Sequence, residues 1–335
     1  MIDKVLYKLR STPLRSAGLV LGLGLLALAA STSARAQTFT GADLGTPTLT
    51  GTATVNTDGT IAIKGGGSDF WGASDSGYYY FAPVSGQTWS LVVRIRDLQG
   101  PDGWTKCNLM VRQDDGSGVP QASDPHISVM TTRKDGQNEI RTHYRPTYSV
   151  DTREIAPSPA IRPAYPNAWL GIQRLGSIFS TWVSADGVNW TKLGQLDTAG
   201  TADNFDGYAW RDTVLVGVAV TAHNNDNTTG ATATISDLRV QASPASSAIT
   251  ITATKQVQNV AAYQGSQASF SFDTTNSVVP AFIEATYQWY KNNQLVTNAT
   301  GKTFTFLAGP DDNNAKVYCV ASLPAPFTKS LNSAT

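Results

Sequence analysis

A chain of 335 residues is longer than one typical domain, so two folded domains are expected. Only 15% of the residues are charged, and Lys plus Arg equal Asp plus Glu at 25 each, so the sequence offers no concentrated basic surface for nucleic acid. Abundant Gly, Ser, Thr and Asn favour strands and turns over long helices. The composition therefore indicates an all-β protein without a nucleic-acid partner.

Residues 1–36 have the pattern of a cleavable secretory signal peptide. Basic residues up to Arg15 precede an uncharged run at 17–30, and Ala-Arg-Ala at 34–36 fits a small-x-small cleavage site. A membrane anchor is the alternative, but the run is shorter than the ~20 apolar residues that a bilayer requires. We expect a bacterial protein that is secreted, extracellular or cell-surface, or periplasmic, with no membrane span after cleavage.

Residues 37–240 form the first predicted domain. Apolar residues alternate with polar ones at 89–96, and the runs 169–174, 178–184 and 190–193 are separated by short Gly-containing turns, which is typical of antiparallel strands. The run 214–220 is apolar on both faces and indicates a central strand. The proline-rich segment 147–167 lacks a period, so we expect a surface loop or an arm crossing the sheets.

A polar linker at 241–248 separates a second domain at 249–335. Five further strands are expected there, at 249–254, 268–272, 287–291, 303–307 and 316–322. The chain ends where a last strand is expected to pair, so we expect this domain to be incomplete at its C-terminus.

The second domain resembles a bacterial immunoglobulin-like domain. The resemblance rests on Tyr-Gln-Trp-Tyr-Lys at 287–291, with Trp289 as the core tryptophan, and on the segment 311–322 around Cys319. It implies a small β-sandwich. The position expected to pair with Cys319 falls in Ser-Phe-Ser-Phe at 269–272, and Cys107 lies in the first domain, so no disulfide is expected.

The first domain resembles the concanavalin A-like lectin/glucanase (LamG-like) sandwiches. Four stretches carry the likeness, namely Gly-Ser-Asp-Phe-Trp-Gly-Ala-Ser-Asp at 67–75, Lys-Cys-Asn-Leu-Met-Val-Arg at 106–112, Trp-Leu-Gly-Ile-Gln-Arg at 169–174 and 216–224. The resemblance implies a jelly-roll of two curved sheets, and a glycan bound on one face or at the loops of its rim. A polysaccharide or glycoconjugate is therefore the expected partner.

The sequence lacks the closely spaced carboxylates that glucanases on this fold use. Glu139 and Glu154 are the only glutamates of the first domain, and no strand alternation links them. We therefore expect no enzyme but a carbohydrate-binding, lectin-type module, with the immunoglobulin-like domain as a spacer or adhesion unit. Two alternatives remain, a cryptic extracellular glycoside hydrolase that uses Asp69 with Asp75, and spacer domains of a larger cell-envelope protein.

Candidate ligand-binding side chains combine aromatic rings, which stack on sugars, with arginines that hydrogen-bond hydroxyl groups. They are Trp71, Tyr78, Tyr80, Trp104, Arg112, Arg141 and Arg145. For each of the aromatic residues, a place in the core is the competing interpretation. Asp69 and Asp75 are candidate calcium ligands, because Ca²⁺ prefers carboxylate oxygens, although they equally fit a turn that bonds its own backbone. No other cofactor is expected.

Overall fold

The computed structural model divides the chain into two compact units. The sandwich unit spans Ala34–Ser243, and the C-terminal unit comprises Pro244–Thr335 together with Met1–Ser33. The described residues are 6–8, 37–133, 138–157, 160–226, 228–242, 249–276, 284–323 and 329–335. Most of the predicted signal peptide (1–36) and of the predicted linker (241–248) therefore lies outside the described residues.

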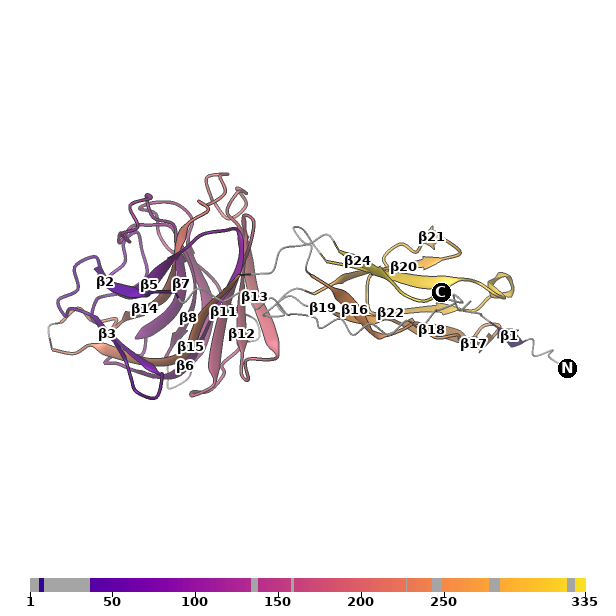
Figure 1. The fold of residues 1–335 in the computed structure, drawn as a ribbon, viewed down its shortest axis with the longest axis horizontal. Coiled ribbons are helices and arrows are strands. Elements are labelled where there is room, and N and C mark those ends of the chain that lie inside the picture. The colour runs from indigo at the N-terminus through magenta and orange to yellow at the C-terminus, as the bar shows by residue number, and fades with distance from the viewer. Residues whose placement is uncertain are drawn as a thin grey trace, which may run out of the picture. The chain divides into compact units, whose positions relative to one another are not determined.

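The sandwich unit consists of two antiparallel sheets of seven strands each (Figure 1). In order, the first sheet contains β10 (Arg153–Ile155), β9 (Glu139–Arg145), β8 (His126–Thr132), β7 (Lys106–Arg112), β14 (Val214–Thr221), β5 (Gly77–Val84) and β2 (Thr40–Leu44). The second sheet contains β13 (Trp190–Asp197), β12 (Ile178–Ser184), β11 (Ala168–Leu175), β6 (Thr88–Gln99), β15 (Ala231–Ala242), β4 (Ile61–Gly65) and β3 (Thr52–Val55).

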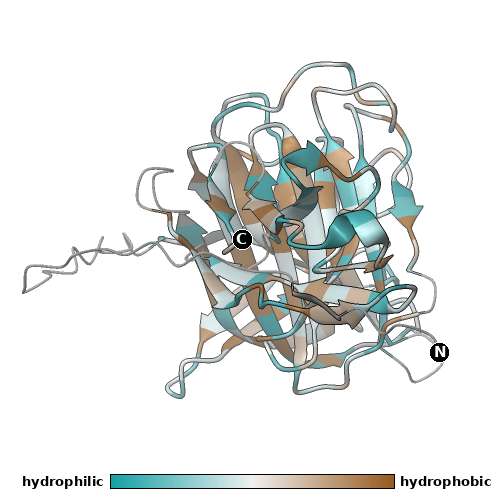
Figure 2. Cartoon of the chain, turned by 90° about the vertical axis from the view of Figure 1, so that its right-hand side faces the viewer, coloured by the Kyte–Doolittle hydropathy of each residue, from teal (hydrophilic) through white to brown (hydrophobic). Residues whose placement is uncertain are grey.

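The core lies between the two sheets and follows from the two-residue alternation. Leu91, Val93 and Ile95 of β6 pack with Leu109 and Val111 of β7 in one cluster of buried side chains. Intervening residues point to the opposite face, since successive side chains of a strand alternate. Figure 2 shows hydrophobic and hydrophilic residues alternating along the strands. The predicted all-β fold class is confirmed.

Strand β14 has the central position that its apolar sequence predicts. It pairs with β5 on one side and β7 on the other, and all of its residues are buried. Its small Gly217 is required there, because a Cβ atom would lie 2.0 Å from the carbonyl oxygen of Tyr80. At Gly217, strand β14 therefore lies in close contact with strand β5.

The outer face of the first sheet, which points away from the second sheet, is polar along β9, whereas Tyr79, Met110 and Leu215 form an apolar cluster on β5, β7 and β14. On β9 the alternating residues Glu139, Arg141, His143 and Arg145 occupy this face, while Thr142 points inward and its hydroxyl contacts that of Thr181 of the second sheet at 2.6 Å. The loop that follows β4 lies against this face, since Gly72 accepts a hydrogen bond from Arg145 Nη2 at 2.9 Å. The polar part of this face thus meets a loop.

The sequence suggests that the proline-rich segment 147–167 is a surface loop or an arm crossing the sheets. In the structure, part of this segment forms a strand. Within it, β10 pairs with β9, with Glu154 opposite His143. The sequence does not predict this strand, because three residues are too few to establish a period.

The C-terminal unit is built from short antiparallel strands around its own core. Trp289, fully buried, is paired in register with Cys319, and both cysteines of the chain are free and buried. Its strands are β1 (Leu6–Lys8), β16 (Ile251–Lys255), β17 (Ala261–Tyr263), β18 (Gln267–Ser271), β19 (Asp273–Asn276), β20 (Thr286–Lys291), β21 (Gln294–Leu295), β22 (Thr303–Leu307), β23 (Val317–Ser322) and β24 (Ser330–Asn332), with a 3₁₀ helix at Pro310–Asp312. The immunoglobulin-like resemblance stays a prediction.

None of the helical residues that the structure describes forms a helix long and apolar enough to span a membrane.

Candidate functional site

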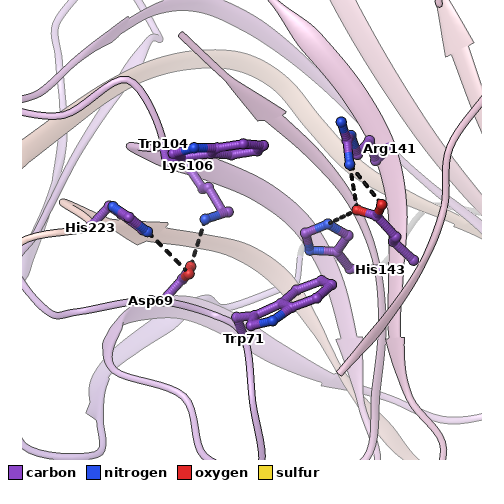
Figure 3. Close-up of a pocket in the computed structure, with 8 residues that line it drawn as sticks. Asp69, Trp71, Trp104, Lys106, Arg141, His143 and His223 are labelled. Carbon is purple, nitrogen blue, oxygen red and sulfur yellow. Dashed lines mark hydrogen bonds and ion pairs between the residues drawn. The ribbon is translucent and has the colours of Figure 1, made fainter. Parts of the chain in front are cut away.

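A cavity of about 350 Å³ opens on the outer face of the first sheet (Figure 3). Strands β7, β9 and β10 contribute part of its wall, and the remainder comes from the loop after β4, the loop before β7 and the residues after β14. The lining residues are Asp69, Trp71, Trp104, Lys106, Arg141, His143, Glu154 and His223. The pocket thus combines two tryptophans with two carboxylates, two cations and two histidines.

One end of the pocket is organised around Asp69. Its Oδ1 accepts a hydrogen bond from Lys106 Nζ at 2.6 Å and another from the Phe70 backbone N–H at 2.7 Å, and its Oδ2 lies 3.4 Å from His223 Nε2. Burial lowers the pKa of Lys106, while Asp69 opposes that effect. The two oxygens of Asp69 therefore have different partners, a lysine and a histidine.

The other end is organised around Glu154. Both of its carboxylate oxygens contact Arg141 Nη1, at 2.7 and 2.6 Å, and Oε2 lies 3.8 Å from His143 Nε2. Arg141 also pairs with Glu139. His143 and Arg141 together lower the pKa of Glu154 to about 2, so this carboxylate is ionised at neutral pH. Burial lowers the pKa of His143, which favours its neutral form.

The two tryptophans lie on opposite sides of these charged groups (Figure 3). Trp71 is 42% exposed and contacts the His143 ring edge-on, with centroids 5.1 Å apart. The Trp104 ring lies 5.3 Å from Lys106 Nζ and 5.6 Å from the Arg141 guanidinium carbon. A saccharide entering the pocket would meet aromatic surface on two sides and hydrogen-bonding groups at both ends.

Asp75, Arg112 and Arg145 form a separate cluster that is fully buried. The Asp75 carboxylate contacts Arg112 Nη1 at 2.5 Å and Arg145 Nη2 at 2.7 Å. Burial opposes ionisation of Asp75, but Arg112, His126 and Arg145 outweigh it and lower its pKa to about 2. The two arginines, predicted as ligand-binding residues, are thus directed at a carboxylate rather than at solvent.

The cluster nevertheless supports the pocket. Arg145 also donates to the Gly72 carbonyl at 2.9 Å, and Asp75 belongs to the same loop that carries Asp69 and Trp71. Asp69 pairs with Ser76 and so closes the loop. The contacts that anchor Asp75 therefore also hold the backbone of Asp69 in place.

The remaining predicted residues lie elsewhere. Tyr78 is 8% exposed and belongs to the core between the sheets, and Tyr80 packs against that core and stacks on Phe39. Asp69 and Asp75 do not share a site, because one faces the pocket and the other is enclosed by two arginines. In the described part of the chain, no three His, Cys, Asp or Glu side chains are grouped to hold a metal ion.

Four of the predicted residues, Asp69, Trp71, Trp104 and Arg141, do line the pocket. Sequence reasoning missed Lys106, His143, Glu154 and His223. Two of these residues could have been found from the sequence. Lys106 and His143 are polar residues that alternate with the inward-facing residues of β7 and β9 and so lie on the face opposite the core. Glu154 and His223 required the fold, since neither has a local pattern.

The sandwich unit is a β-sandwich of two seven-stranded antiparallel sheets. The chain is similar to a functionally unknown protein from Saccharomyces cerevisiae (17% identity, 61% of this chain and 97% of that chain, TM-score 0.44). It is also similar to the GH43 protein BlXynB from Bacillus licheniformis (11% identity, 55% and 33%, TM-score 0.39) and to the kappa-carrageenase from Pseudoalteromonas carrageenovora (10% identity, 62% and 97%, TM-score 0.34). No protein family and no curated protein matches the sequence.

These comparisons correct one prediction. The sequence had suggested that the chain is not an enzyme, whereas the solved structures of this fold that it resembles include a carrageenase and alginate lyases. The prediction, which rested on the lack of closely spaced carboxylates in the sequence, is wrong.

Proposed function

We propose that the sandwich unit is a glycoside hydrolase that binds its saccharide between Trp71 and Trp104. The observation that carries the proposal is that two carboxylates from different elements, Asp69 and Glu154, line the same aromatic-walled pocket. Hydrolysis of a glycosidic bond needs two carboxyl groups, one on each side of the bond. A cavity of about 350 Å³ lies in the range of small-ligand sites.

The two carboxylates are suited to different roles. Glu154 is ionised at neutral pH, so we assign it to the attacking water, whose proton it accepts. We assign to Asp69 the role of proton donor, and its Oδ2 lies next to His223. The bond between the anomeric carbon and the glycosidic oxygen breaks, the leaving oxygen takes a proton from the Asp69 side, and water oxygen bonds to the anomeric carbon.

The charges in the pocket favour hydrolysis of a neutral saccharide over elimination from an acidic one. An eliminating enzyme needs cations to neutralise the carboxylate of its substrate. Asp69 accepts a hydrogen bond from Lys106, and Arg141 is paired with Glu139 and Glu154. Each cation of the pocket therefore already has a hydrogen-bond acceptor.

We also propose that the protein acts outside the cytoplasm, with the C-terminal unit as a spacer or adhesion domain. The signal-peptide pattern at 1–36 and the immunoglobulin-like motif around Trp289 support this part of the proposal.

The test is a cleavage assay with the purified chain on a panel of neutral and acidic polysaccharides. New reducing ends without unsaturated uronate are expected from a neutral glycan. Glu154→Gln and Asp69→Asn are each expected to lower kcat by about 10²–10⁴-fold. Glu284→Gln, in the C-terminal unit, is the matched control and should leave the rate unchanged.

Two results would overturn the proposal. One is the absence of cleavage on every polysaccharide of the panel. The other is unsaturated uronate as the product, which would mean elimination instead of hydrolysis.

A further inference from the structure

His223 has an uncommon backbone conformation for a residue with a side chain. It follows β14 with φ at 57°, in the left-handed region that residues other than glycine rarely adopt. The neighbouring backbone holds it there, because Ala222 N–H donates to Gly66 O at 3.3 Å and Asn224 N–H donates to Gly67 O at 3.1 Å. Residues kept in such conformations are concentrated at functional sites.

The imidazole of His223 lies between carboxylates from two other loops. Nε2 is 3.4 Å from Asp69 Oδ2, and Nδ1 is 3.0 Å from Asp102 Oδ1. Asp102 does not line the pocket but is itself oriented, since its Oδ1 accepts a hydrogen bond from the Trp104 backbone N–H at 2.6 Å. The side chain is 31% exposed, so solvent can reach it.

We propose that His223 is the proton-transfer residue that reloads Asp69, and that Asp102 positions its ring. This inference rests on the proposed hydrolase function. Lys106 occupies Oδ1 of Asp69, which leaves Oδ2 to exchange a proton with Nε2. In each turnover Asp69 gives a proton to the leaving oxygen, takes one from His223 Nε2, and His223 recovers one from solvent. Glu154 releases to solvent the proton that it took from water, so the cycle balances.

The charged groups around the imidazole come from three elements. Asp69 and Asp102 face its two nitrogens, and Lys106 of β7 lies beyond Asp69. On the far side of the pocket are His143 and Glu154.

The deciding variant is His223→Gly. Glycine favours a positive φ, so this change removes the imidazole without straining the backbone, and the fold should be retained. We expect kcat to fall by about 10²-fold or more while KM changes little, and added imidazole to restore part of the rate.

Asn204→Gly is the matched control. Asn204 also has a positive φ, at 62°, and lies on an exposed loop away from the pocket. Its replacement should leave kcat and the pH profile unchanged. If Asp102 positions the ring of His223, Asp102→Asn should lower kcat less than His223→Gly does. Added imidazole should not restore the rate of Asp102→Asn.

If the parent cleaves glycan and His223→Gly has the same kcat and pH profile as the parent, this inference is overturned. The proposed function would then still stand. Loss of rate without rescue, together with a raised KM, would also overturn this inference, because that result indicates a binding role. If the parent cleaves no glycan, both proposals fail.

Discussion

Glu154 of β10 lies directly opposite His143 of β9, and their side chains meet in the pocket wall with Oε2 3.8 Å from Nε2. This pairing brings a carboxylate from a poorly patterned segment next to the guanidinium of Arg141. The electrostatics of this end of the pocket follow from that strand register.

Arg141→Gln should move the acid limb of the activity profile upward. His143 and Arg141 hold the pKa of Glu154 at about 2, against an ordinary value of 4.5, so removing the guanidinium lets that pKa rise. The ionised form of Glu154 would then be lost at a higher pH. The measurement is kcat/KM against pH. Arg153→Gln, an exposed arginine on the neighbouring position of β10, is the control and should leave the limb in place.

Asp75→Asn should destabilise the sandwich unit strongly. The change leaves Arg112 and Arg145 buried without a carboxylate, and breaking a buried pair in this way costs about 3–5 kcal/mol. Urea unfolding at neutral pH measures the loss, with the exposed Asp237→Asn as control. A change under 1 kcal/mol would contradict the anchoring role that we assign to Asp75.

The same cluster sets an acid-sensitivity window. Because the folded pKa of Asp75 is about 2 and its unfolded pKa is about 3.9, Asp75 stabilises the folded state above the unfolded value. That stability is lost as the pH falls through the folded pKa. In Asp75→Asn the free energy of unfolding should therefore depend less on pH between about 4 and 2.

Asp124→Asn should act in the opposite direction. Burial raises the pKa of Asp124 to about 6, so the folded state holds a proton that the unfolded state releases above about 3.9. Stability contributed by that proton falls as the pH rises from about 4 to 6. The amide of asparagine stays neutral, so the variant should lose this slope and be more stable than the parent at pH 7. Denaturant midpoints measured across this range decide the point, and an unchanged slope would rule out a raised pKa.

Trp71→Ala should weaken substrate binding more than catalysis. Trp71 offers exposed aromatic surface at the pocket, and an aromatic contact of about 0.5–1.5 kcal/mol corresponds to roughly a 2- to 12-fold rise in KM. Tyr208→Ala removes another exposed ring, 80% accessible and outside the pocket, and should have no effect. Equal effects in both variants would argue against a sugar platform at Trp71.

Local patterns in the sequence were enough to predict several of the strands. The two-residue period at 89–96 became β6, and the runs around Trp169 and Phe179 became β11 and β12, because strand geometry depends on neighbouring residues. The turn between β12 and β13 is likewise local, with Asp186 accepting backbone hydrogen bonds from Val188 and Asn189 at 2.8 and 2.7 Å.

The arrangement of the pocket was decided by the tertiary structure alone. Asp69, Trp71, Trp104 and Arg141 were suspected from their chemistry, but so were Arg112 and Arg145, which proved to be enclosed around Asp75. Glu154 and His223 carried no local signal. Their neighbours come from strands and loops distant in the chain, and which side chains meet there depends on strand register, which the packing of the whole sandwich sets.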